Sequence, residues 1–174
     1  MAHVHLIEGP VGAGKSTFAA QLSATHAAPH LALDDWMARL FAPDRPETDL
    51  MPWYVERKDR CIDQIWKITR GLIDTGTDVI LELGLIQRTA RQQFYARLDT
   101  ADIAHTVYVL DAPKDIRHAR VRRRNEEQGP TFSMVVPDAI FEIASGLWEP
   151  PDETERATRD IRFITPDATQ FSAS

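Results

Sequence analysis

The sequence predicts an α/β fold in which parallel strands form a sheet and helices cover both of its faces. The first observation behind this prediction is a recurrence of strand-like apolar runs, at residues 3–8, 30–34, 78–83, 104–110 and 160–164. Helix-like stretches separate these runs, and such alternation is typical of a parallel sheet. The second observation is a glycine-rich segment that follows the first run and leads directly into a helix-forming stretch.

The glycine-rich segment runs from Gly9 to Ser16 and matches the pattern G-x-x-x-x-G-K-[ST] of phosphate-binding loops. Glycines let the backbone curl so that its N–H groups point at phosphate oxygens. Lys15 is expected to reach the β- and γ-phosphates, and the Ser16 hydroxyl is expected to bind Mg²⁺. The following helix adds the positive end of its dipole. A nucleoside triphosphate is therefore expected to bind through Gly9, Gly12, Ala13, Gly14, Lys15, Ser16 and Thr17.

The other elements are predicted in chain order from apolar spacing and from proline and glycine positions. The second strand ends at Asp34 and Asp35, and a buried third strand closes on Glu82. A tail from Asp167 onward is expected to be loosely held. The predicted helices cover a stretch after Ser16, residues 36–41, a long segment from Pro52 to about residue 75, residues 88–98, residues 113–125 and residues 140–148, with a loop at 42–51.

Length, charge and cysteine content limit the classes of protein. A chain of 174 residues is most simply one domain, spanning residues 1–174. The net charge of −6 argues against a general nucleic-acid-binding protein, which needs a basic surface. Cys61 is the single cysteine, so no internal disulfide can form, and a buried, inert thiol is expected. With no apolar run of membrane-spanning length and no signal peptide, a cytoplasmic location is the default expectation.

Acidic residues follow three of the predicted strands. Ligands bind beyond the carboxyl ends of the strands in such sheets, so these residues are expected near the phosphate loop. Asp34 is predicted to be the base that accepts the proton of a phosphate acceptor, with Asp35 as the cap of the next helix. Glu82 is predicted to help hold Mg²⁺, or instead to contact an acceptor hydroxyl. Asp111 is assigned to capping the helix at Pro113.

An arginine-rich helix and the polar segment after it resemble a lid, at roughly residues 117–136. Arg120 and Arg124 are four residues apart, so both can converge on one transferring phosphate. Arginine suits this role because its fork stabilises charge on the phosphate oxygens. Arg117, by contrast, is predicted to be solvated or paired with surface acids, and so are Arg122 and Arg123. Arg88 and Arg91 are considered as further groups that reach the acceptor or the lid.

Four segments together resemble the small P-loop kinases typified by chloramphenicol phosphotransferase, zeta toxin and gluconate kinase, and more closely the bacterial AAA-type ATP-binding proteins of that group. These segments are Gly9–Thr17, Leu33–Met37, Val79–Gly84 and Arg120–Asn125. The resemblance implies a P-loop NTPase fold with five parallel strands and the loop after a central strand. It also implies ATP and Mg²⁺ as the donor, Asp34 as the base, Arg120 and Arg124 as lid arginines, and an adenine-binding region near Thr165 and Pro166.

Several functions remain open at this point. The first is a kinase that moves the γ-phosphate of ATP to a hydroxyl of a small molecule. The alternatives are a zeta-toxin-like kinase of nucleotide sugars, a nucleotide-dependent ATPase or switch acting through a protein partner, and a polynucleotide kinase, which the charge disfavours. The sequence names neither the acceptor nor the oligomeric state, although Trp36, Met37, Trp53 and Tyr54 could line a pocket for a ring-bearing substrate.

Overall fold

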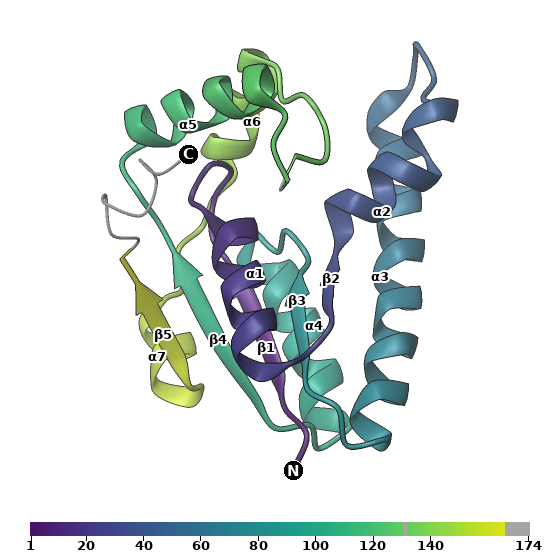
Figure 1. The fold of residues 1–174 in the computed structure, drawn as a ribbon, viewed down its shortest axis with the longest axis vertical. Helices are drawn as coiled ribbons and strands as arrows, with labels where there is room; N and C mark the ends of the chain where they lie inside the picture. Colours follow the sequence, from purple (N-terminus) through teal and green to yellow (C-terminus); the bar gives the residue numbers. More distant parts are fainter. Residues whose placement is uncertain (131, 166–174) are drawn as a thin grey trace.

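The sheet has five parallel strands in the order β2-β3-β1-β4-β5 (Figure 1). The structure, a computed structural model, describes residues 1–130 and 132–165. The predicted parallel sheet is therefore confirmed, and the glycine-rich loop follows its central strand. The strands are β1 (Val4–Glu8), β2 (His30–Ala32), β3 (Val79–Glu82), β4 (His105–Leu110) and β5 (Ile161–Ile164).

Helices cover both faces of the sheet, as predicted. Side chains of β1 alternate between these faces because strand periodicity is two residues. Leu6 packs in the core with residues of α3 and α4, whereas Ile7 packs with Ala19 of α1 on the opposite face. Cys61 of α3 is buried in the first of these clusters, as expected. The helices are α1 (Lys15–His26), α2 (Leu33–Leu40), α3 (Leu50–Asp74), α4 (Arg88–Thr100), α5 (Lys114–Glu127), α6 (Asp138–Gly146) and α7 (Glu153–Thr158), with a 3₁₀ turn at Ala42–Asp44.

The second strand is shorter than predicted, and this changes the surroundings of Asp34. β2 ends at Ala32 and α2 begins at Leu33, so both Asp34 and Asp35 lie in the first helical turn. Carboxylates are favoured there by the positive end of the helix dipole. Ala32 occupies the cap position, so the prediction that Asp35 caps this helix is wrong. Asp111 does not cap α5 either, because its carboxylate accepts hydrogen bonds from the Ala112 amide and the Trp148 indole.

A buried ionic network joins β1, α4 and α7. Arg91 is fully buried and donates two hydrogen bonds to Glu155, from Nε at 2.8 Å and from Nη2 at 2.9 Å. Its Nε also lies 3.7 Å from the Glu8 carboxylate. The prediction that Arg91 reaches the acceptor or the lid is therefore wrong. Arg88 Nε pairs with Asp152 Oδ2 at 2.9 Å, and Asp152 is the cap residue of α7, so Arg88 also connects α4 to α7.

Glu8 makes stability depend on pH. Burial raises the pKa of this carboxyl to about 8, although the hydrogen bond from Tyr95 and the charge of Arg91 act in the opposite direction. The unfolded chain therefore loses this proton at lower pH than the folded protein. The contribution of Glu8 to stability is fully present below about pH 4.5 and is lost as the pH rises through about 8.

Replacing Glu8 with glutamine should remove this pH dependence. Between pH 5 and pH 9, the free energy of unfolding of Glu8→Gln is expected to rise by about 2–4 kcal/mol relative to that of the unmodified protein. Urea unfolding followed by circular dichroism at both pH values measures the difference. Parallel pH profiles for the two proteins would show that Glu8 is ionised in the folded state at neutral pH.

Candidate functional site

The loop between β1 and α1 has the backbone conformation of a curled phosphate-binding loop. Gly9, Gly12 and Gly14 have φ values of 145°, 80° and 95°, which side chains other than glycine rarely adopt. A Cβ at Gly12 would lie 2.6 Å from the Arg117 carbonyl oxygen, and one at Gly9 would collide with the Leu110 carbonyl oxygen. At Gly9 and Gly12 the backbone conformation and the lack of room for a side chain therefore both require glycine.

Lys15 opens α1 and turns back over the loop. Its Nζ donates a hydrogen bond to the Pro10 carbonyl oxygen at 2.9 Å. Burial lowers the pKa of this ammonium group, the carboxylates of Glu82 and Asp34 oppose that shift, and the charge of Arg124 adds to it. The structure thus brings Lys15, Asp34, Glu82 and Arg124 into one electrostatic neighbourhood, although they come from four different segments of the chain.

Ser16 and Glu82 form a pair of oxygen ligands at the end of β3. Ser16 Oγ donates to Glu82 Oε1 at 3.0 Å, and the other carboxylate oxygen lies 3.1 Å from His30 Nε2. Burial alone would raise the pKa of Glu82, but His30, Lys15 and Ser16 together lower it, so the carboxylate is ionised. A hydroxyl beside an ionised carboxylate is a donor set that suits a hard cation such as Mg²⁺. No sequence motif predicts the part of His30, which reaches Glu82 from the neighbouring strand β2.

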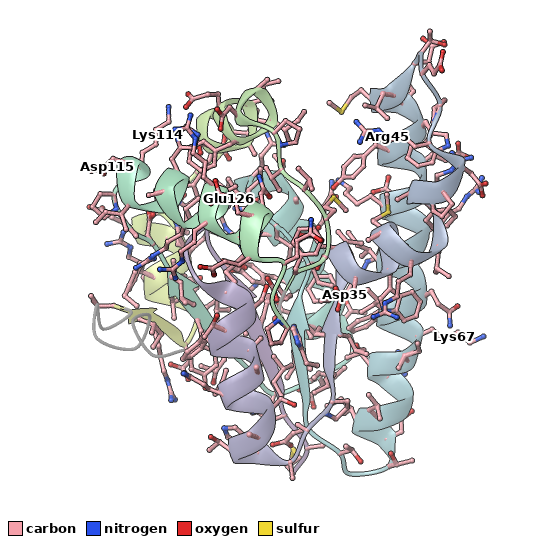
Figure 2. The ribbon with its side chains drawn as sticks, turned by 45° about the horizontal axis from the view of Figure 1, so that its top comes forward. Asp35, Arg45, Lys67, Lys114, Asp115 and Glu126 are labelled. Carbon is pink, nitrogen blue, oxygen red and sulfur yellow. The ribbon has the colours of Figure 1, made fainter. Side chains whose placement is uncertain are left out.

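Asp34 and Asp35 have separate surroundings. The pKa of Asp34 is raised, first by loss of hydration and then by the Glu82 carboxylate, while Lys15 and Arg124 act against this. Because the Asp34 side chain is exposed, water screens these charges. Asp35, labelled in Figure 2, projects from α2. Its carboxylate accepts a hydrogen bond from the hydroxyl of Ser133, in the loop after α5, at 2.7 Å. Asp34 is therefore the carboxylate beside Lys15, and Asp35 contacts the predicted lid.

Arg117 is buried against the phosphate-binding loop, so it is not solvated. The alternative prediction, a pair with a surface acid, agrees with Asp111, whose Oδ1 lies 3.9 Å from Arg117 Nε. Arg117 Nη1 donates to the Val11 carbonyl oxygen at 2.9 Å and to Ser145 Oγ at 3.1 Å. Val121, four residues later, contacts the same loop beside Gly12. The spacing of Arg117 from an apolar residue on the same helix face was the sequence signal for its burial. Through the hydrogen bond to Val11, Arg117 thus stabilises the conformation of the phosphate-binding loop.

Arg124 lies on the same face of α5, two turns after Arg117. It is half-buried, and its Nε is a buried donor with no hydrogen-bond acceptor among the residues that the structure describes. A buried cationic donor beside Lys15 and Asp34 suits a phosphate oxygen. Arg120 lies one turn before Arg124 and is also half-buried.

Two hydrogen bonds close the segment between Asn125, near the end of α5, and Val136. Asn125 donates to the Val136 carbonyl oxygen at 2.8 Å and accepts from the Val136 amide at 3.0 Å. Together with the bond from Ser133 to Asp35, these contacts connect α5 to α2 across the end of the sheet. Of the other predicted nucleotide-binding residues, Thr17 is half-buried in the first turn of α1, and Pro166 lies outside the described residues.

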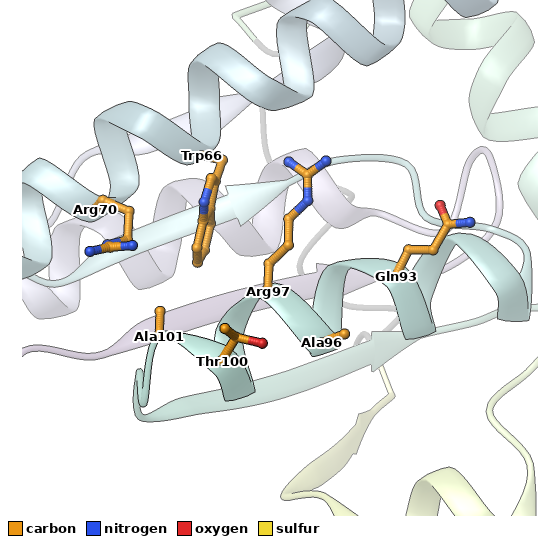
Figure 3. Close-up of a pocket in the computed structure, with 7 residues that line it drawn as sticks. All are labelled: Trp66, Arg70, Gln93, Ala96, Arg97, Thr100 and Ala101. Atoms are coloured by element: carbon orange, nitrogen blue, oxygen red, sulfur yellow. The ribbon is translucent and has the colours of Figure 1, made fainter.

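A groove between α3 and α4 is far from this group of residues. It has a volume of about 330 Å³ and is lined by side chains such as Trp66, Gln93 and Arg97 (Figure 3). None of its lining residues belongs to the phosphate-binding loop, β3 or α5. The groove is therefore separate from the polar group around Lys15.

The sequence matches the AAA domain family over residues 4–143. This chain belongs to that family. The match spans all the strands except β5 and includes the phosphate-binding loop, Asp34, Glu82 and the α5 arginines. Family membership implies nucleotide binding. No protein with a curated description matches the chain by sequence.

Solved structures with the same fold include several kinases. A sugar kinase from Janibacter sp. HTCC2649 has 14% identity and a TM-score of 0.65, covering 95% of this chain and 86% of its own. A gluconokinase from Sinorhizobium meliloti has 15% identity and a TM-score of 0.56, with 94% and 82% covered. Kti12 from Chaetomium thermophilum, solved with ADP-AlF3, has 13% identity and a TM-score of 0.69, with 94% and 89% covered. At these identities the likeness establishes the P-loop kinase fold.

No helix among the described residues combines the length and the apolar character needed to cross a bilayer.

Proposed function

We propose that this protein is an ATP-dependent phosphotransferase that moves the γ-phosphate of ATP to a hydroxyl group of a small molecule. The observation that supports this best is the position of Asp34. An accessible carboxylate with a raised pKa lies in the same electrostatic neighbourhood as the phosphate-loop lysine, Lys15. Transfer to an alcohol is assisted by a carboxylate that accepts the proton of the acceptor hydroxyl.

In this proposal the Asp34 carboxylate accepts the proton of the acceptor hydroxyl. The acceptor oxygen forms a bond to the γ-phosphorus as the bond to the ADP oxygen breaks. Lys15 and Arg124 hold charge on the phosphate oxygens, with Arg120 as a further lid arginine. The raised pKa of Asp34 makes it a stronger base than an ordinary aspartate.

Ser16 and Glu82 are the residues that would hold Mg²⁺. Their oxygens are 3.0 Å apart, and the Glu82 carboxylate is kept ionised by its neighbours. When bound, the ion neutralises developing charge on the phosphates. His30 then acts from outside the ligand set by orienting the second carboxylate oxygen of Glu82.

Tyr54 supports an acceptor site on the α3 side of Asp34. Burial and, after it, the charge of the Asp34 carboxylate together raise the pKa of this phenol to about 12. A half-buried ring beside the proposed base could pack against a cyclic acceptor. The fold shared with a sugar kinase and a gluconokinase agrees with a hydroxylated small molecule as acceptor.

The direct test is acceptor-dependent release of ADP. Purified protein is assayed with ATP and Mg²⁺ against sugars, hydroxylated antibiotics, nucleosides, nucleotide sugars and an oligonucleotide with a 5′-hydroxyl. Stimulation by one class of small molecule, with a phosphorylated product in the mass spectrum, is the expected result. Stimulation by nucleotide sugars alone would favour the zeta-toxin-like alternative, and stimulation by the oligonucleotide alone would overturn the small-molecule proposal.

A switch that acts through a protein partner is the second candidate. The fold shared with Kti12, which was solved with ADP-AlF3, is the observation that favours it. Slow hydrolysis that no acceptor changes would replace the kinase proposal with this one.

Arg124→Lys should separate the guanidinium fork from its positive charge. We expect kcat to fall by about 10- to 100-fold, because an ammonium group makes no bidentate contact with phosphate oxygens. Arg123→Lys is the matched control, since Arg123 is exposed on the same helix and lies 3.7 Å from Glu127. Equal rates for the two variants would exclude a catalytic part for Arg124.

A further inference from the structure

Two histidines and an aspartate meet at the amino end of the sheet, away from the phosphate-binding loop. Among the residues that the structure describes, His5, His26 and Asp78 form a group whose ligand atoms all lie within 4.8 Å of one another. His5 belongs to β1, His26 ends α1, and Asp78 immediately precedes β3. His5 and Gly9 are four positions apart in the chain, which corresponds to about 13 Å along the strand. The group is therefore separate from the nucleotide site.

The spacing of these atoms is close to that of ligands around one metal ion. Asp78 Oδ2 lies 3.6 Å from His5 Nε2 and 3.8 Å from His26 Nδ1. Two ligands of a tetrahedral Zn²⁺ ion with bonds near 2.0–2.1 Å are separated by about 3.3–3.4 Å. Shifts of a few tenths of an ångström would complete both pairs. The rings of His5 and His26 are close, with centroids 4.2 Å apart.

Nε2 of His5 lies 3.6 Å from Asp78 Oδ2, which is beyond hydrogen-bond distance. His5 is only 4% exposed, and its Nε2 is a buried atom without a hydrogen bond among the described residues. Burying a polar atom in this way is costly unless something binds it.

The outer contacts of the group hold its ligands in place. His5 Nδ1 lies 3.2 Å from the Tyr108 hydroxyl, which leaves Nε2 to face Asp78 and His26. Asp78 Oδ1 accepts a hydrogen bond from the His3 amide at 2.8 Å, which leaves Oδ2 for a ligand. Metal-binding histidines and carboxylates in proteins are supported by contacts of this kind.

From these observations we propose that His5, His26 and Asp78 bind a divalent transition-metal ion of the Zn²⁺ type. The side chains of His26 and Asp78 are 34% and 28% exposed, so the ion can enter from solvent and keep water as a further ligand. Nitrogen and carboxylate ligands in this number suit Zn²⁺ and Co²⁺ better than Mg²⁺. The ion would tie the end of α1, the helix that carries Lys15, to β1 and to the start of β3.

The test uses the full chain without an affinity tag, at pH 7.5. Zn²⁺ is titrated in competition with a chromophoric chelator, and Co²⁺ binding is followed by visible absorption. We expect one site that His26→Ala and Asp78→Asn each weaken by more than about 100-fold, a larger loss than the 10- to 100-fold typical of an outer contact. Tyr108→Phe should give that smaller loss. Both ligand variants should fold, because His26 is partly exposed and asparagine keeps the oxygen that accepts from His3.

Two controls locate the binding. His118→Ala removes another histidine paired with an aspartate, 2.7 Å from Asp138, and Glu82→Gln removes the carboxylate of the nucleotide site. Both should bind Zn²⁺ like the unmodified protein. The proposal is overturned if the chelator outcompetes the protein for Zn²⁺ completely, if His26→Ala and Asp78→Asn bind normally, or if only Glu82→Gln loses the ion.

Discussion

Replacing Asp34 with asparagine is expected to lower the rate of phosphoryl transfer by about 10²- to 10⁴-fold and to leave the affinity for ATP nearly unchanged. Asparagine has almost the same shape as aspartate but cannot accept the acceptor proton. ATP affinity should persist because the loop glycines, Lys15 and Ser16 are untouched. Single-turnover rates and a direct ATP-binding titration measure the two quantities separately. In the unmodified protein, the acid limb of the rate profile should lie above pH 3.8, since the pKa of Asp34 is raised.

Asp35→Asn provides the matched control for this prediction. Asp35 is the adjacent residue in the same helical turn, and its carboxylate accepts a hydrogen bond from Ser133 that asparagine can also accept. Its rate should stay within about tenfold of the original, because loss of charge at a lid contact affects closure and not proton transfer. Full turnover in Asp34→Asn would rule out Asp34 as the base, and a loss confined to Asp35→Asn would transfer that role to Asp35.

Arg91→Ala should produce the largest loss of stability. Arg91 is fully buried between the carboxylates of Glu155 and Glu8 and also donates to the Glu149 carbonyl oxygen at 2.7 Å. Its removal leaves Glu155 buried without a counter-charge, which costs about 3–5 kcal/mol in comparable buried pairs. The free energy of unfolding in urea, measured near pH 7, gives the value.

Arg97→Ala is the control on the same helix. Arg97 pairs with Asp63 at 2.7 Å, but the two side chains are 39% and 66% exposed. An exposed pair contributes at most about 1 kcal/mol. A loss below 1 kcal/mol for Arg91→Ala would mean that water or a local rearrangement compensates the buried carboxylates. Adding Glu155→Gln to Arg91→Ala should recover part of the stability, because the uncompensated charge is then removed.

Sequence reasoning was least accurate where a side chain is used by a distant segment. Arg91 was considered for the acceptor site because it follows Glu82, yet its partner Glu155 lies 64 residues away in a helix that was not predicted. Arg117 is predicted to be solvated or paired with surface acids, because arginines spread around a helix cannot all face one site. Its long side chain instead donates to the loop at Val11, 106 residues earlier. In both cases the packing of helices, which no local pattern encodes, decided which groups the side chain contacts.

The sequence by itself determined the parallel sheet, the phosphate-binding loop and the family. These depend on local information, namely apolar periodicity over a few residues and the fixed spacing of glycines, Lys15 and Ser16, which chain geometry translates directly into structure. Only the tertiary structure decided which of two adjacent aspartates lies beside Lys15, that His30 supports Glu82, and that His5, His26 and Asp78 meet. Such groupings depend on strand order and on the faces that helices present, because sheet register brings together residues that no local pattern connects.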